Sequence, residues 1–196
     1  MTMAVRNILK VFRLATENEV HNGTVWYGIA QHEAANIAYA FDLPIRIVVG
    51  VIAALSPNNT WERNTTNASD MIAVYLRGGD VSECKPSTYL KMRDKAWSIL
   101  QRMPATDDDV IKILNGQKIV SFFRNILGHD TCTVDGHAFN IANGKRIGLT
   151  DPDVNISKGQ YRELQDAYSR AGKRVGLKSY QIQAITWVAW KRMHNI

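Results

Sequence analysis

The stretch 116–140, GQKIVSFFRNILGHDTCTVDGHAFN, decides the expected fold. A glycine turn at Gly116 opens an amphipathic helix that carries Lys118 in its first turn. A loop follows, and Asp135 precedes a second helix whose apolar face begins at Ala138. The pattern places one amine and one carboxylate at the starts of two consecutive helices, 17 residues apart. A lysine and an aspartate that converge on one cleft can attack an electrophilic carbon and stabilise a developing cation.

Each of these two residues also has an ordinary structural interpretation. An aspartate before a helix usually accepts hydrogen bonds from the N–H groups of the first turn. Lys118 fits the pattern of a solvated helix residue equally well. The extended approach through Thr133 and Val134 indicates that Asp135 lies at a rigid loop–helix junction, where functional sites are often found. Both interpretations stay open for both residues.

The length and composition of the chain limit the classes of protein to which it can belong. At 196 residues and 45% hydrophobic content, the chain predicts a single domain over 1–196 with a sizeable core. The two cysteines, Cys84 and Cys132, form no CxxC pair, so we expect no metal and no cofactor. Few cysteines fit a reducing compartment. The apolar stretch 47–55 is too short to span a membrane, and no signal segment is visible, so we expect a cytoplasmic protein.

The positive charge is concentrated at one end. Residues 1–140 hold 14 Lys+Arg and 14 Asp+Glu, whereas residues 141–196 hold 10 and 4, which accounts for the whole net charge of +6. A basic segment favours a polyanionic partner, of which nucleic acid is the commonest. A solvated helix face is the alternative. Within this segment, Lys173, Arg174 and Lys178 surround two glycines in a basic turn that is suited to phosphate.

Apolar residues recur at helical spacing along the whole chain, so the sequence predicts an all-α fold. Asn22-Gly23 is read as a turn, and 78–87 and 150–157 are read as exposed loops. The expected helices cover 3–15, 25–41, 44–55, 60–76, 87–103, 107–114, 117–127, 136–143, 157–171 and 178–194.

Three short segments in this order resemble the helix-hairpin-helix DNA glycosylase superfamily, the endonuclease-III-like enzymes. They are Ala54-Leu-Ser-Pro-Asn-Asn-Thr-Trp-Glu-Arg-Asn64, Asn115-Gly116-Gln117-Lys118 and Val134-Asp135-Gly136-His137. The resemblance covers 54–149 and leaves helical extensions at both ends. It implies a helical domain with a cleft between two helical lobes.

The resemblance also implies an activity and roles for particular residues. It implies cleavage of the N-glycosidic bond of a damaged or modified base, flipped out of double-stranded DNA, in DNA repair or DNA modification. Asp135 would stabilise the cationic sugar, and Lys118 would act as nucleophile or contact a phosphate. The residues expected to bind DNA or the flipped base are Asn58, Asn59, Trp61, Asn64, Asn115, Gly116, Gln117 and His137, with the basic turn Lys173, Arg174 and Lys178.

The chain departs from the superfamily pattern at several positions. Leu114 replaces the first hairpin glycine, Gly136 replaces a threonine, and Pro57 stands where a glutamine often lies. The cysteines that bind an iron–sulfur cluster are missing, as in many branches. Related phage domains act on hypermodified pyrimidines by transfer chemistry, so a phage-type transferase in a bacterial or infected cell, near the nucleoid, is one alternative. A non-catalytic nucleic-acid-binding domain is the other, and the oligomeric state is left open.

Overall fold

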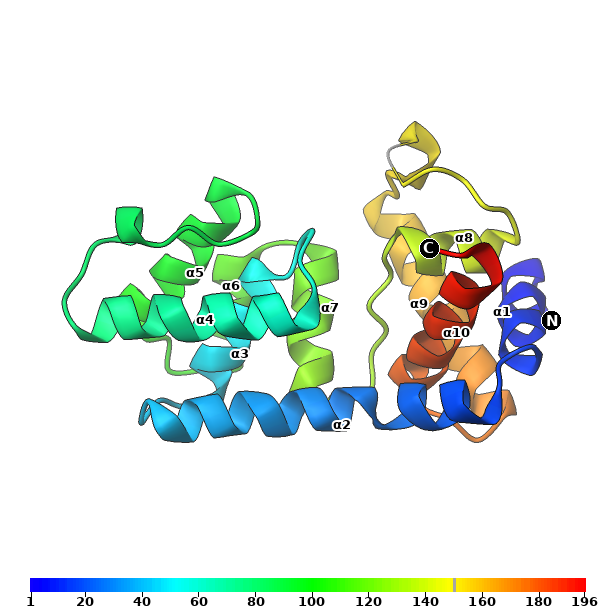
Figure 1. The fold of residues 1–196 in the computed structure, drawn as a ribbon. Helices are drawn as coiled ribbons and strands as arrows, with labels where there is room; N and C mark the ends of the chain where they lie inside the picture. The colour runs from blue at the N-terminus through cyan, green and yellow to red at the C-terminus, as the bar shows by residue number, and fades with distance from the viewer. Residues whose placement is uncertain (150) are drawn as a thin grey trace. The chain divides into compact units, whose positions relative to one another are not determined.

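The computed structural model describes residues 1–149 and 151–196, and every regular element in these ranges is helical (Figure 1). The all-α prediction is therefore confirmed for the described residues. The α-helices are α1 (Met3–Arg13), α2 (Glu17–Ala40), α3 (Ile45–Leu55), α4 (Trp61–Leu76), α5 (Leu90–Arg102), α6 (Asp107–Leu114), α7 (Gln117–Ile126), α8 (Gly136–Asn143), α9 (Lys158–Arg174) and α10 (Ser179–His194). Two short 3-10 helices, η1 (Val81–Glu83) and η2 (Pro152–Val154), lie in the connections.

The chain forms two compact units. Unit 1 comprises Met1–Ile29 and Gly128–Ile196, and unit 2 comprises Ala30–Leu127. Helix α2 contributes its first half to unit 1 and its second half to unit 2. The single domain expected over 1–196 stays a prediction.

No single helix among the described residues is long and apolar enough to cross a membrane. Helices α2 and α3 meet that test only as a pair, which is bent by 118°.

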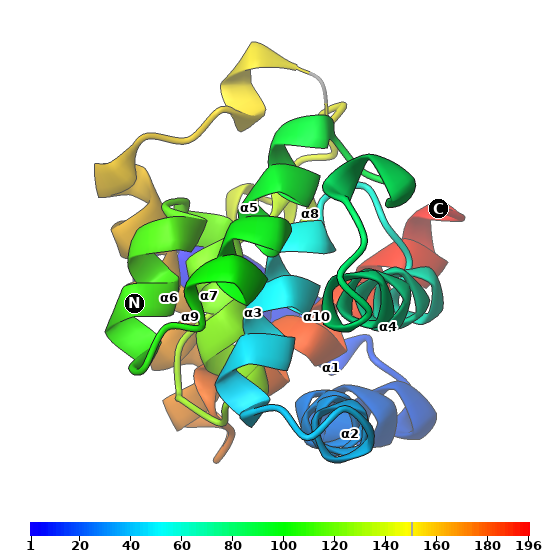
Figure 2. The same cartoon turned by 90° about the vertical axis from the view of Figure 1, so that its left-hand side faces the viewer.

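Unit 2 is built around α3. Every side chain from Ile47 to Leu55 is buried, because this helix is apolar on nearly all sides and needs neighbours all round. Helices α4, α5, α6 and α7 supply them, and Figure 2 shows α3 beside α5 and α7. Gly50 permits the close packing: a Cβ there would lie 2.8 Å from Cγ1 of Val110 in α6. The buried centre expected at 44–55 is confirmed.

Unit 1 consists of α1, α8, α9 and α10, which pack on one another around a common core, with the first half of α2. Its largest fully buried side chains include Ile8 and Tyr168. Gly23 of α2 meets α10 at short range, because a Cβ at this position would lie 2.5 Å from the backbone nitrogen of Ile185. Only glycine allows this approach of two helix backbones.

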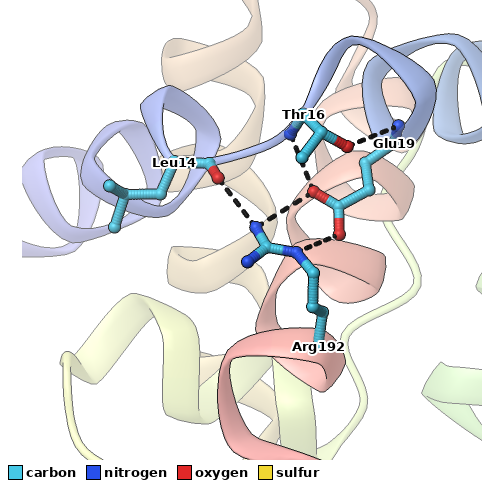
Figure 3. Close-up of polar contacts among 4 residues, drawn as sticks. All are labelled: Leu14, Thr16, Glu19 and Arg192. Carbon is cyan, nitrogen blue, oxygen red and sulfur yellow. Dashed lines mark hydrogen bonds and ion pairs between the residues drawn. The ribbon is translucent and has the colours of Figure 1, made fainter.

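A polar junction ties the start of α2 to the end of α10 within unit 1 (Figure 3). The N–H of Thr16 donates to Oε2 of Glu19 at 2.8 Å, and the N–H of Glu19 donates to the Thr16 hydroxyl at 3.3 Å. Arg192 donates from Nε to Oε1 of Glu19 at 2.7 Å and from Nη2 to the carbonyl of Leu14 at 2.8 Å. The reciprocal bonds satisfy N–H groups at the helix start, and the guanidinium neutralises the buried carboxylate.

The expected elements agree with the structure except at some ends. Helix α2 begins at Glu17 rather than at 25, so the turn predicted at Asn22-Gly23 is wrong. The glycine serves a helix–helix contact instead of a turn. Helix α9 continues to Arg174, three residues beyond the expected end. The loop expected at 78–87 contains η1 and that at 150–157 contains η2, while Thr150 lies outside the described residues.

Candidate functional site

Asp135 is the N-cap residue of α8 in unit 1. Its backbone is extended, and Oδ1 accepts a hydrogen bond of 2.8 Å from the N–H of Ala138. Its other oxygen, Oδ2, accepts a hydrogen bond of 3.1 Å from the indole Nε1 of Trp187 in α10. The capping interpretation is thus confirmed. The same two bonds hold a half-buried carboxylate in one orientation at the positive end of a helix.

The ring of Trp187 contacts two further side chains, those of Lys191 and His137. The ammonium of Lys191, one turn further along α10, lies 4.5 Å from the Trp187 ring centroid. The imidazole of His137 meets the same ring edge-on, with centroids 6.1 Å apart. The indole ring therefore contacts both a cation and an imidazole while its N–H donates to the carboxylate. Trp187 and Lys191 are not among the site residues predicted from the sequence, and their spacing of four positions is the one sign of their pairing.

Helix α9 fixes the chain on both sides of Asp135. The hydroxyl of Tyr161 accepts a hydrogen bond of 3.1 Å from the N–H of Val134. The hydroxyl of Tyr168 donates one of 3.1 Å to the carbonyl of Ala138. Both rings are buried, so the chain on each side of Asp135 is anchored to α9 by a hydrogen bond to a buried side chain.

Buried neutral groups lie close to the Asp135 carboxylate. Burial raises the pKa of the Tyr27 phenol well above its usual value, and the charge of Asp135 adds to this effect. Burial likewise raises the pKa of the Cys132 thiol, again with a contribution from Asp135. Both groups therefore stay protonated at neutral pH, and Asp135 is placed beside a neutral interior.

Lys118 lies in unit 2, in the first turn of α7, and its side chain is exposed. The turn that precedes α7 differs from the expected glycine turn. Asn115, with φ of 42°, takes the left-handed conformation, whereas Gly116 is extended at φ of −161°. Asparagine tolerates this conformation better than most residues. Asn115 and Gly116, the C-cap of α6 and the N-cap of α7, lie between the two helices, and Gln117 is the first residue of α7.

Three of the predicted base contacts are amides at the start of α4 in unit 2. Asn58 is exposed and donates from Nδ2 to the hydroxyl of Tyr89 at 2.6 Å. Asn59 donates from Nδ2 to Oδ1 of Asn67 at 3.3 Å. Asn64 is buried and donates from Nδ2 to the carbonyl of Ile52 at 3.0 Å. The Oδ1 atoms of Asn59 and Asn64 are buried without a hydrogen-bond partner among the described residues.

Trp61, the fourth predicted base contact, begins α4 and is half-buried. Its indole N–H donates to Oε2 of Glu33, and its ring meets Phe122 edge-on with centroids 6.4 Å apart. Packing and hydrogen bonding therefore both hold this ring. Glu33 of α2 is thus the acceptor for the indole N–H of Trp61.

The basic turn lies in unit 1 and is exposed. Lys173 and Arg174 form the last turn of α9, and Lys178 is the N-cap of α10. Gly172 permits the tight connection, because a Cβ there would lie 2.6 Å from the carbonyl oxygen of Leu177. The three cations are thus brought to one end of the α9–α10 pair, as predicted.

The predicted site residues divide between the two units. Asp135, His137 and the basic turn belong to unit 1, and Lys118, the hairpin and the amides of α4 belong to unit 2. A cleft shared by Lys118 and Asp135 therefore stays a prediction. Within 1–149 and 151–196, no group of three or more His, Cys, Asp or Glu side chains is arranged to hold a metal ion.

Comparison with known proteins places the chain in a family. The model of a family of unknown function (DUF7178) matches residues 1–194. The chain belongs to this family. The match spans both compact units. No curated protein and no solved structure matches the chain.

Proposed function

We propose that this protein is a DNA-base-directed enzyme of the helix-hairpin-helix glycosylase type, which cleaves the N-glycosidic bond of a damaged or modified base. One observation carries the proposal. The Asp135 carboxylate is held in a fixed orientation at a helix N-terminus, and it follows a hairpin of α6, Asn115-Gly116 and α7 in the order that the superfamily uses. The all-helical fold is in keeping with this order.

The proposed role of Asp135 is electrostatic. Departure of a base leaves positive charge on the sugar, and a preoriented carboxylate beside it lowers the barrier. The bonds from Ala138 and Trp187 support this role, since a carboxylate that is already oriented needs no rearrangement during the reaction. The neutral interior at Tyr27 and Cys132 favours it too, because charge interactions are stronger where water is excluded.

Lys118 has two possible roles in such an enzyme. Attack on the sugar carbon by its amine would give a Schiff base and requires an uncharged amine. A phosphate contact requires only a charged, accessible ammonium at a helix start. The exposure of Lys118 favours the phosphate contact and hence a water nucleophile. Borohydride, which reduces a Schiff base, should then trap no covalent protein–DNA adduct. A trapped adduct that disappears in Lys118→Ala would restore the amine mechanism.

Amides and an aromatic ring at the start of α4 are the groups proposed to bind the flipped base. Asn58 is exposed and would meet the base directly, whereas the oxygen of Asn59, which accepts no hydrogen bond among the described residues, is buried and would be reached only after Asn59 turns. An amide can read the hydrogen-bonding edge of a base, and Trp61 offers a ring beside it. Asn64 would act indirectly, because it is buried and bound to the backbone of α3. His137 is proposed to contact DNA near Asp135.

A non-catalytic DNA-binding domain is the second candidate, and one observation favours it. Both oxygens of Asp135 already accept hydrogen bonds within the protein, as they would in a purely structural cap. In that case the exposed cations at 173–178 and Lys118 would carry the whole function.

Incubation of the protein with duplexes that carry different damaged and modified bases, followed by mass analysis of the strands, tests the proposal. A glycosylase that uses water lowers the mass of one strand by the mass of the free base less that of the water that replaces it. A transferase changes the mass of the base without releasing it. Binding with unchanged masses on every duplex would favour the non-catalytic candidate.

A further inference from the structure

A basic hollow lies between α5 and α6 in unit 2, and its lining includes none of the residues that the proposed function uses. It has a volume of about 440 Å³. Five of its lining residues come from α5 and two from α6. The lining residues are Lys91, Asp94, Lys95, Ser98, Arg102, Lys112 and Ile113.

The sequence of α5 brings these side chains to one face of the helix. Positions 91, 95, 98 and 102 recur at spacings of three and four residues, so they form a stripe along one side. Lys112, in the last turn of α6, lines the same hollow. With a rise of about 1.5 Å per residue, the stripe from Lys91 to Arg102 extends over about 16 Å. An extended anion with several charges could contact it at more than one point.

Most of the positive charge in the hollow is not neutralised by the protein. Four cations and the single carboxylate of Asp94 line it, and Asp94 is paired with Arg93 at 2.9 Å. A smaller hollow next to it adds Asp109, which pairs with Lys112 at 2.9 Å. Within the part of the chain that the structure describes, neither Lys91 nor Arg102 forms an ion pair.

Lys95 is affected by the positive charge of Lys91 in this hollow. It is half-buried and donates to the carbonyl of Leu114 at the end of α6, where a cation complements the helix dipole. Burial lowers the pKa of Lys95, and the nearby charge of Lys91 lowers it further. Each of these effects opposes the charged form, and an anion between Lys91 and Lys95 would relieve the second of them.

We infer that the hollow between α5 and α6 is a phosphate-binding site, and that the phosphates belong to the backbone of a nucleic-acid strand. Phosphate recognition follows from the uncompensated cations of Lys91 and Arg102 and from the stripe that they form. The choice of a strand as the source of the phosphates rests on the proposed function. The length of the stripe favours it, since a strand of DNA presents one charge per 3.4 Å of axis.

This site is distinct from the phosphate contacts expected from the sequence. Those were the hairpin before α7 and the basic turn at 173–178, and the excess of positive charge pointed only to residues 141–196. Residues 1–140 are neutral overall, so the hollow depends on the segregation of charge within unit 2 rather than on a net excess. One face of α5 and the last turn of α6 bring together cations that are separated by up to 21 positions, from Lys91 to Lys112.

The test uses the full chain and two variants with the same change of charge. Lys91→Gln with Arg102→Gln removes the two unpaired cations and leaves Lys95 to cap α6. Lys85→Gln with Arg124→Gln removes two exposed cations elsewhere in unit 2. Binding of a labelled DNA duplex of about 20 base pairs is measured over a range of salt concentrations. Tripolyphosphate is then added as a competitor, and circular dichroism verifies that each variant is folded.

The slope of log K against log salt is negative, and each phosphate contact contributes about 0.9 to its magnitude. The inference predicts that this magnitude is smaller by about 1.8 in the Lys91/Arg102 variant. The slope of the Lys85/Arg124 variant should equal that of the native protein. Equal slopes in all three proteins, or equal losses in both variants, would overturn the inference. So would tight, Lys91- and Arg102-dependent binding of tripolyphosphate without DNA binding, since the ligand would then be a free polyphosphate.

The outcomes separate this inference from the proposed function. A lowered slope with no base release on any duplex would uphold the phosphate site and remove the glycosylase. Base release by the native protein with an unchanged slope in the Lys91/Arg102 variant would uphold the enzyme and remove the site.

Discussion

The indole N–H of Trp187 donates to Oδ2 of Asp135 across 52 positions of sequence, at 3.1 Å. This bond joins α10 to the N-cap residue of α8 within unit 1. It acts together with the cap bond to Ala138, so each carboxylate oxygen has its own donor. The orientation of the proposed catalytic group therefore depends on a residue near the C-terminal end of the described chain.

The first prediction concerns the stability that these two bonds supply. Asp135→Ala removes both acceptors and should lower the free energy of unfolding by about 0.5–2 kcal/mol through loss of the cap alone. Asp135→Asn keeps an oxygen for the N–H of Ala138 and should lose less. Trp187→Phe, which leaves the cap intact, is the matched control for the second bond. Urea unfolding of the three variants measures the differences, and an Asn variant as unstable as the Ala variant would contradict the assigned cap.

A pair of glycines in α2 should respond to alanine in opposite directions. A Cβ at Gly23 would lie 2.5 Å from the backbone nitrogen of Ile185, which has little room to move, so Gly23→Ala should cost about 1–3 kcal/mol. Nothing lies within 4 Å of a Cβ at Gly28, so Gly28→Ala should stabilise the helix by about 0.5–1 kcal/mol. Thermal unfolding of both variants measures this. Changes of the same sign would refute the close crossing of α2 and α10.

The junction of Glu19 and Arg192 predicts a dependence of stability on pH. The hydrogen bond from Arg192 lowers the pKa of Glu19 from its usual 4.5, against the opposing effect of burial. A carboxyl with a lowered pKa in the folded state stabilises the protein above its unfolded pKa, and this contribution is lost as the pH falls through the folded value. Glu19→Gln should therefore cost about 1–3 kcal/mol at pH 7 and progressively less below pH 4.5.

Glu17→Gln, at an exposed position of the same helix turn, is the control for that experiment. It should change the free energy of unfolding by no more than about 0.5 kcal/mol. Unfolding by urea at a series of pH values between 3 and 7 gives both curves. If the Glu19→Gln variant stays equally destabilised over this whole range, the ion pair is not the source of the pH dependence.

The basic turn predicts how DNA binding responds to salt. Lys173, Arg174 and Lys178 are exposed together at one end of α9 and α10, and phosphate contacts release counterions. Neutralising all three with glutamine should flatten the plot of log K against log salt by up to about 2.7. Lys145→Gln with Arg162→Gln and Lys158→Gln serves as the control of equal charge within the same segment. An unchanged slope in the first variant places the phosphate contacts elsewhere.

Much of the helical fold could be predicted because its signals are local. Helices α6, α7 and α8 follow from residues that lie within each segment, such as the acidic first turn of α6 and the capping aspartate of α8. The start of α2 was missed because the use of Gly23 is decided by Ile185, a residue of another helix. Local turn chemistry contains no information about such a contact.

The candidate site was predictable only in part for the same reason. Asp135 was recognised from its position before a helix. The bond from its second donor, Trp187, spans 52 positions of sequence, and no pattern within one segment indicates it. The same holds for the bond from Arg192 to Glu19 elsewhere in unit 1, which spans 173 positions. The hollow at α5 and α6 is not indicated by net charge, because residues 1–140 carry none, although three of their cations lie on one face of α5 and a fourth lies on α6.

The central claim, that Asp135 is a catalytic carboxylate, is tested most directly by comparing native protein and Asp135→Asn on the same modified duplexes in single-turnover reactions. Asparagine retains an oxygen for the N–H of Ala138, while it removes the charge and the acceptor of the Trp187 N–H. Circular dichroism verifies that the variant is folded. The account predicts a strand of lower mass, by one base, with the native protein and a rate at least about 100-fold slower with the variant. Base release at the native rate by Asp135→Asn would contradict the account and leave Asp135 as a helix cap alone.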